Sequence, residues 1–131
     1  MKFNRATDYS IRLLTHLAVN KKSWVSRDLA GELHIPYNHI SKVVNGLSRR
    51  GYILARKGKG GGIKLGMDPK KISLYSVIVG MEGPIVLSEC VAHKEKCVFS
   101  GKCNFRKYLI KAGAKMIRMF KSMTIADLAS V

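Results

Sequence analysis

Three cysteines, Cys90, Cys97 and Cys103, lie within fourteen residues of one Lys-rich segment, and the chain of 131 residues contains no others. Zinc sites usually contain a short Cys-x2–4-Cys pair, which the spacing Cys-x6-Cys-x5-Cys lacks. Wider loops suit a larger body such as an iron–sulfur cluster, and three thiolates leave one position of a four-ligand set open. The residues by themselves favour an iron–sulfur cluster, while free thiols, a redox disulfide with a spare cysteine, and zinc remain alternatives.

The surroundings of these cysteines suit anionic sulfur. Lys94, Lys96 and Lys102 would stabilise thiolates and an anionic cluster. An odd number of cysteines argues against a disulfide framework. The sequence shows no targeting signal and no apolar run of the ~20 residues that span a bilayer, so we expect a cytoplasmic protein without membrane contact, whose thiols stay reduced.

The charge of the chain predicts a polyanionic partner. The formal net charge is +16, and 47% of the residues are hydrophobic, which is enough for a folded core. The length predicts one domain. A solvated basic surface or a ribosome-associated protein is the alternative to a nucleic-acid-binding protein.

Apolar periodicity predicts the elements that would position these residues. A first helix should begin at residue 4 or 7 and end at residue 19. Two short helices follow over residues 26–33, with Ser26 as the N-cap, and over residues 37–50, with Gly51 after the end. A tight turn joins these two helices, which is the helix-turn-helix arrangement.

The second of these two helices carries polar side chains that are long enough to reach base edges and phosphates in a major groove. We therefore expect DNA to be contacted by Asn38, Ser41, Lys42, Asn45 and Arg49. An ordinary solvated helix face is the alternative.

A β-hairpin follows, with strands over residues 52–55 and 63–65 around a glycine-rich tip. From Arg49 to Lys64 there are six basic residues and no acidic one. A thin basic ribbon can enter or straddle a minor groove, so Lys57 and Lys59 are candidates for groove or phosphate contacts. The pattern of a phosphate-binding P-loop is absent. The hairpin is therefore predicted to be the wing of a winged helix-turn-helix.

The last third should contain an amphipathic segment over residues 74–81, the cysteine loop, and a long helix whose apolar stripe runs from Phe105 to Met123. The other subunit of a homodimer would cover that stripe, although packing against its own domain is the alternative. Thr124 and Asp127 resemble the capping box of a final short helix. The predicted fold is thus mainly α with a small β-hairpin wing: a winged helix-turn-helix DNA-binding domain over 1–83, a cluster-binding loop over 84–104, and a long C-terminal dimerisation helix with a tail over 105–131.

Short motifs run along the chain in a specific order: Thr7-Asp8-Tyr9, Asn38-His39-x-x-Lys42, Arg50-Gly51-Tyr52, the wing from Gly58 to Leu65, Leu87-x-x-Cys90, Cys97-x5-Cys103, and Thr124 to Leu128. Each motif is weak alone, but the ordered set is highly specific. On these motifs the chain resembles, over essentially its full length, the family of winged-helix iron–sulfur transcriptional repressors that contains NsrR and IscR.

Thr7-Asp8-Tyr9 and the final motif look most like the nitric-oxide-sensing NsrR branch. That resemblance implies a 4Fe-4S cluster held by the three cysteines, with Asp8 of the partner subunit as the fourth ligand. A carboxylate is a weak and exchangeable ligand for iron in a sulfur cage. Stabilisation of a helix dipole is the alternative role of Asp8. The IscR branch is expected to place a histidine ligand where this chain has Arg106. The gap from Cys90 to Cys97 also departs from the commonest spacing of the family, so a 2Fe-2S cluster is the alternative cluster type.

The sequence therefore predicts a homodimeric transcriptional repressor that binds double-stranded operator DNA and senses nitric oxide or redox state through an iron–sulfur cluster. A cluster-free thiol-redox regulator and an IscR-like regulator of iron–sulfur supply are the alternatives. We predict no enzymatic activity, because the sequence offers no nucleophile–base pattern, nucleotide fingerprint or paired carboxylates.

Overall fold

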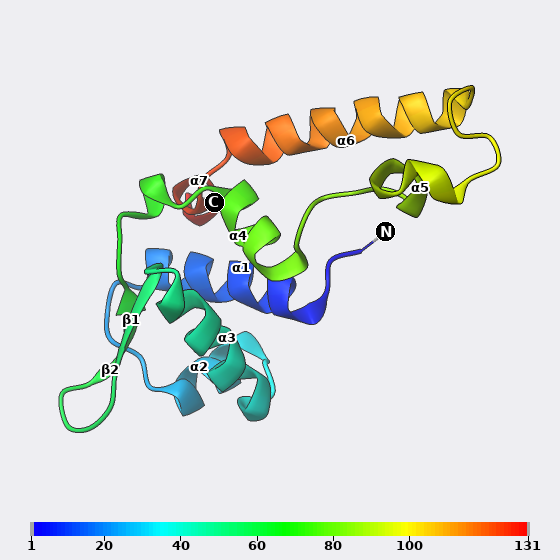
Figure 1. Ribbon diagram of the computed structural model, residues 1–131. Coiled ribbons are helices and arrows are strands. Elements are labelled where there is room, and N and C mark those ends of the chain that lie inside the picture. Colours follow the sequence, from blue (N-terminus) through cyan, green and yellow to red (C-terminus); the bar gives the residue numbers. More distant parts are fainter. Residues whose placement is uncertain (1, 131) are drawn as a thin grey trace.

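The computed structural model describes residues 2–130 and shows a helical protein with one β-hairpin (Figure 1). The central helix α1 lies between α3 on one side and α4 and α7 on the other, and α6 forms a long outer layer. The elements are α1 Arg5–Val19, α2 Ser26–Leu33, α3 Tyr37–Arg49, β1 Ile53–Arg56, β2 Gly62–Leu65, η1 Pro69–Lys71, α4 Leu74–Glu82, α5 Glu89–Ala92, η2 Lys94–Lys96, α6 Asn104–Ser122 and α7 Ile125–Ala129.

Helix α1 is the centre of the core. Its N-terminus is capped by Asn4, whose side chain accepts a hydrogen bond from the backbone N–H of Thr7 at 2.8 Å. Leu13, Leu14 and Leu17 are almost fully buried; Leu14 and Leu17 belong to the predicted apolar stripe, and Leu13 adds to it. Their burial lets α1 contact α2, α3, α4 and α7.

The helix-turn-helix is confirmed in α2 and α3. The turn between them contains His34 in the left-handed region, with φ of 53°. The predicted N-cap Ser26 is wrong by one residue, because Val25 takes the cap position and its carbonyl accepts from Leu29 N–H at 3.1 Å. Gly51 adopts φ of +76° after the end of α3, where a residue with a Cβ would be strained, so its predicted helix-ending role is confirmed.

The wing is an antiparallel hairpin in which Ile53 pairs with Leu65 and Arg56 pairs with Gly62. The other edge of β2 is bridged by Trp24, whose N–H donates to the carbonyl of Ile63 at 2.9 Å and whose carbonyl accepts from Ile63 N–H at 2.7 Å. Ile53 and Ile63 are buried. The base of the wing is therefore fixed to the core, and its tip projects beyond it.

Helix α7 returns the chain to the winged-helix core. Leu74 N–H donates to the carbonyl of Met123 at 2.9 Å, Ile125 N–H donates to the carbonyl of Ile72 at 3.0 Å, and Ile72 and Ile125 are fully buried. The predicted division at residues 83 and 104 stays a prediction. The structure adds that α7, which belongs to the predicted segment 105–131, packs in the core of the predicted segment 1–83.

The predicted capping box of α7 is confirmed. The backbone N–H of Thr124 donates to the Asp127 carboxylate at 2.7 Å, and the Thr124 hydroxyl donates to it at 2.8 Å. These bonds, the backbone one first, lower the pKa of Asp127 below its ordinary value of 3.8.

The predicted apolar stripe of α6 divides into two faces. Met116 and Phe120 are half-buried, and the Phe120 ring lies 6.0 Å from that of Phe3. Phe105 and Tyr108, by contrast, are each 68% exposed, and Met119 is 55% exposed. Within α6 only Gly113 is buried. Packing against its own domain thus covers one side of the helix and leaves a second apolar side open.

Candidate DNA interface and cysteine loop

Helix α3 separates a buried face from an exposed polar face. Ile40, Val43, Val44 and Leu47 face the core. The exposed residues include all five predicted DNA contacts of this helix, Asn38, Ser41, Lys42, Asn45 and Arg49. The structure therefore brings these side chains onto accessible surface, and their role in DNA binding stays a prediction.

A groove of about 830 Å³ lies between α2, α3 and the wing. Ser41, Asn45 and Lys57 line it, so helix and wing residues that are distant in sequence share one surface. Arg27 and Arg56 also line this groove, together with the exposed ring of Tyr37. Arg27, Arg56 and Tyr37 were not selected from the sequence as DNA contacts. The two arginines could have been found, because each is a basic residue in or beside a predicted DNA-binding element.

The wing tip is thin and basic, as predicted. Lys57 and Lys59 are exposed. The glycines between and after them turn the chain with positive φ, +90° at Gly58 and +77° at Gly60, which residues with a Cβ rarely adopt. The tip therefore presents two ammonium groups on a ribbon without bulky neighbours, a shape that fits a minor groove.

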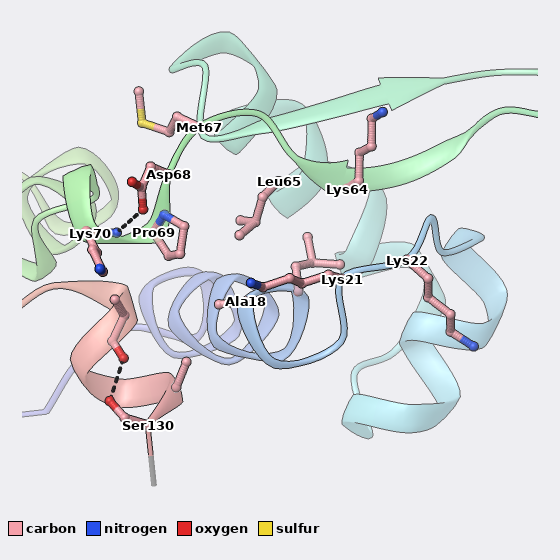
Figure 2. A pocket seen from close by; sticks show the side chains of 13 residues that line it. Ala18, Lys21, Lys22, Lys64, Leu65, Met67, Asp68, Pro69, Lys70 and Ser130 are labelled. Atoms are coloured by element: carbon pink, nitrogen blue, oxygen red, sulfur yellow. Dashed lines mark hydrogen bonds between the residues drawn. The ribbon is translucent and has the colours of Figure 1, made fainter.

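A second hollow, of about 690 Å³, lies at the base of the wing between α1, β2, η1 and α7 (Figure 2). Lys21, Lys22, Lys64 and Lys70 are among the residues that line it. Figure 2 shows that Lys22 and Lys64 point away from one another, while Lys21 lies across the hollow toward Ala18. Because these ammonium groups do not converge, the hollow lacks the directed polar groups of a small-molecule site. It adds positive charge beside the wing.

The cysteine loop leaves α4, forms α5 and η2, and enters α6. Cys90, Cys97 and Cys103 are free thiols, and each is half-buried. Cys103 is the N-cap of α6, and its Sγ accepts from Arg106 N–H at 3.4 Å. Among residues 2–130 no three His, Cys, Asp or Glu side chains are gathered closely enough to hold a metal ion. The structure thus presents the predicted ligands on one loop without collecting them.

The donor set nevertheless fits an iron–sulfur group in kind. Three unpaired cysteines supply soft sulfur ligands. His93 lies with Nδ1 3.6 Å from a carboxylate oxygen of Glu95, so its ring already has a neighbour within the loop. A fourth ligand would have to come from outside the three cysteines, and its source stays a prediction.

Asp8, the predicted fourth ligand, lies in the first turn of α1. Its Oδ2 is 2.6 Å from Nη2 of Arg12, and Nη1 of Arg12 donates to the carbonyl of Leu33 at 3.5 Å. Asp8 therefore has its own ion pair in the single chain, at the favourable end of the helix dipole. The structure gives it a structural role, and ligation by the partner subunit's Asp8 stays a prediction.

The C-terminal end of α4 connects the cysteine loop to α1 and α3. Arg50, at the end of α3, donates from Nη1 to the carbonyl of Gly46 at 3.2 Å and from Nη2 to the carbonyl of Gly80 at 2.7 Å. Two residues further along α4, a Glu82 carboxylate oxygen accepts from the Thr7 hydroxyl at 2.8 Å. Both α3 and α1 are therefore tied to the helix that leads into the loop.

Comparison with known proteins agrees with these features. Residues 3–130 match the Rrf2 family model, described as an iron-dependent transcriptional regulator. The chain is 35% identical over 131 residues to the HTH-type transcriptional regulator NsrR of Bacillus subtilis, covering 98% of this chain and 90% of that relative. Within residues 2–130, no helix is both long and apolar enough to cross a membrane.

Solved structures confirm the predicted winged-helix fold. CymR, the global cysteine regulator of B. subtilis, matches with a TM-score of 0.83 at 22% identity, over 99% of this chain and 97% of that one. The oxidized form of Staphylococcus aureus CymR matches with a TM-score of 0.76 at 22% identity, over 100% of this chain and 98% of that one.

Proposed function

Because the chain belongs to the Rrf2 family of transcriptional regulators, we propose that it is a homodimeric repressor that binds operator DNA and senses nitric oxide or redox state through an iron–sulfur cluster. The observation that carries this proposal is one chain that joins a basic winged-helix surface to three free cysteines on a neighbouring loop. Relatives named as transcriptional regulators agree with a role that is not enzymatic.

The DNA-binding part of the proposal rests on shape and charge. Helix α3 would lie in a major groove with Asn38, Ser41 and Lys42 toward base edges, while Lys57 and Lys59 of the wing contact a minor groove or phosphates. The groove between them has Arg27 and Arg56 on its walls. A net charge of +16 favours this partner over any neutral one.

The sensing part rests on the cysteines. Cys90, Cys97 and Cys103 would hold the cluster, most simply a 4Fe-4S cluster, and Asp8 of the partner subunit would complete the ligand set. The cluster would supply an iron with a weak, exchangeable ligand that small molecules can reach. The residues of this chain order the loop, half-bury the three thiols and connect the loop to the DNA-binding helices.

The connection to DNA runs through α4. Arg50 ties α4 to the end of the recognition helix, and Glu82 ties it to the N-terminus of α1. When the loop is ordered against another subunit, α4 and both bonded helices are held with it, and the spacing of two recognition helices in a dimer is fixed. A freed loop removes that restraint, so the two states differ in operator affinity.

The test is the iron and acid-labile sulfide content per chain of protein purified without air. About four of each per chain supports the 4Fe-4S sensor and makes a nitric oxide titration of operator binding the next step. About two of each supports a 2Fe-2S regulator. Protein that binds DNA but holds neither iron nor sulfide contradicts the cluster.

A specific observation favours a second candidate, a thiol-redox regulator without a cluster. The three thiols are free, and within residues 2–130 they are not gathered into a metal-binding group. The same fold occurs in the oxidized form of Staphylococcus aureus CymR. Oxidation would join two thiols in a disulfide, with two protons and two electrons passing to an oxidant such as a peroxide. A count of free thiols before and after peroxide treatment of iron-free protein distinguishes this candidate.

A further inference from the structure

Arg106 contacts both ends of the cysteine loop. Its Nε donates to the carbonyl oxygen of Cys90 at 2.9 Å, and its Nη2 donates to the carbonyl oxygen of Val91 at 3.5 Å. Its backbone N–H donates to Sγ of Cys103 at 3.4 Å. One half-buried residue in the first turn of α6 therefore touches the first and the last cysteine of the loop.

Arginine suits this position chemically. The carbonyls of Cys90 and Val91 belong to the short helix α5, whose C-terminal carbonyls lack partners within the helix. A guanidinium offers several donors in a rigid planar fork, so it can satisfy two neighbouring carbonyls together. It has no lone pair for a metal ion, and therefore it can organise ligands without becoming one.

Resting on the proposed cluster function, we propose that Arg106 is a positioning residue that fastens the Cys90 segment to the first turn of α6. Cys90 and Cys103 are thereby held in a fixed relation before any cluster is bound, and Cys97, in the middle of the loop, is the ligand that remains to be brought in. Fixing the ends in advance lowers the conformational entropy that cluster binding must remove. The guanidinium also places a positive charge beside the thiol-bearing segment.

Three full-length variants separate hydrogen bonding from charge. Arg106→Met removes the fork and one positive charge. Lys107→Met removes one positive charge from the next residue, which is exposed. Arg106→Lys keeps the charge but cannot reproduce the planar fork.

The first measurement is amide hydrogen exchange on the cluster-free proteins, with far-UV circular dichroism as the check that each variant is folded. The reporting amides are Val91, which donates to the carbonyl of Ser88, and His93, which donates to the carbonyl of Glu89. Losing a charge-assisted hydrogen bond should speed their exchange about tenfold in Arg106→Met and in Arg106→Lys. Lys107→Met should exchange like the wild type.

The second measurement is the rate at which reconstituted protein loses its visible absorption to a ferrous chelator. We expect about tenfold faster loss in Arg106→Met, no rescue by Arg106→Lys, and the wild-type rate in Lys107→Met. Unchanged exchange at Val91 and His93 in Arg106→Met would falsify the fastening role. Full rescue by lysine, or an equal effect of Lys107→Met, would show that only the positive charge matters. Either result would also contradict the fastening role of Arg106. If the wild type holds no iron or sulfide, the proposed function fails, and the exchange data still decide the role of Arg106.

Discussion

At the residue scale, Asp8 has one observed partner, Arg12, and one proposed role, as a ligand of the cluster. In the single chain it pairs with Arg12, and the two side chains are 47% and 46% exposed. An exposed pair of this i,i+4 kind contributes only about 0.3–0.5 kcal/mol, because water screens both charges. Breaking the pair therefore costs little compared with forming a metal–ligand bond. The ion pair seen here therefore does not exclude the proposed role of Asp8 as a ligand to an iron of the cluster held by a second subunit.

Replacing Asp8 with Ala should weaken cluster retention or shift the spectrum of the bound cluster, because one ligand is removed. Iron content and visible circular dichroism of anaerobic protein measure this effect. Glu32→Ala, which removes an exposed carboxylate from α2, is the control and should keep the wild-type spectrum. An unchanged spectrum and nitric oxide response in Asp8→Ala would rule out ligation by Asp8.

The residues predicted to contact DNA should separate into two kinds. Asn38→Ala should change the preference among operator sequences by about 1–3 kcal/mol at the base pair that it reads. Lys59→Ala should weaken binding to all sequences and lower the slope of log affinity against log salt by about 0.9. Fluorescence anisotropy at several salt concentrations measures both effects, with Lys107→Ala on the outer helix α6 as the control. If neither substitution alters operator binding, the docking arrangement is wrong.

At the element scale, the short helix α7 depends on its cap. Five residues are too few for a stable helix by propensity alone. The capping box satisfies the first turn, and burial of Ile125 ties the helix to α1 and η1. The wing also depends on contacts from outside itself. An isolated two-stranded hairpin is only marginally stable, and the bridge from Trp24 to Ile63 supports this one.

Thr124→Ala should lower the free energy of unfolding by about 1 kcal/mol, because an N-cap side chain is lost.

The pKa of Asp127 is lowered in the folded state. The carboxylate therefore contributes to stability above its ordinary pKa of 3.8, and this contribution is lost as the pH falls through the lower folded pKa. Urea denaturation should therefore show a difference between wild type and Asp127→Asn at pH 7 that shrinks below about pH 4. A difference that persists undiminished at pH 2 would contradict the role of the carboxylate.

The link between α3 and α4 depends on a glycine. A Cβ at residue 80 would lie 2.7 Å from Nε of Arg50, which is too close, so Gly80→Ala must displace the guanidinium. We expect the free energy of unfolding to fall by about 1 kcal/mol, because the lost charge-assisted hydrogen bond outweighs the gain in helix propensity. Gly31→Ala in α2, where a Cβ meets nothing within 4 Å, is the control and should be neutral or stabilising. Equal stabilisation of both variants by thermal denaturation would contradict the link.

At the scale of the whole molecule, two surfaces need partners of different kinds. The basic wing and α3 lie on one side of the molecule, and α6 forms the layer on the opposite side (Figure 1). The apolar residues Phe105, Tyr108 and Met119 of α6 are exposed. The apolar side suits a second copy of the chain, and the charged end suits DNA. In the proposed dimer, this separation would leave both DNA-binding surfaces accessible.

Tyr108→Glu should shift the protein toward monomer, because a charge is placed on the exposed apolar side of α6. The fold should be unaffected, since this side chain is 68% exposed in the single chain. Sedimentation velocity measures the shift, and operator affinity should fall with it. Lys107→Gln changes the charge by the same amount and should remain dimeric. A dimer that persists in Tyr108→Glu would place the interface elsewhere.

Local features were predictable from the sequence. The helical stripe of α1, the end of α3 at Gly51, the glycine-rich wing and the box at Thr124 each depend on residues a few positions apart, and the structure confirms them. Sequence spacing also placed three cysteines on one loop and five polar side chains on exposed positions of one helix. Their functional roles follow from residue chemistry and remain predictions.

Contacts between distant segments were decided only by the tertiary structure. Trp24 pairs with Ile63, Arg50 reaches Gly80, Arg106 reaches Cys90, and α7 packs beside α1. Neither helical nor strand periodicity encodes such pairs, because each pair depends on how elements far apart in the chain pack around a shared core. The sequence by itself therefore determined the longer helices, the hairpin and the chemistry that they carry, but not the short helices η1, α5 and η2. Packing determined which elements contact one another, and hence how the helix that leads into the cysteine loop is tied to α1 and α3.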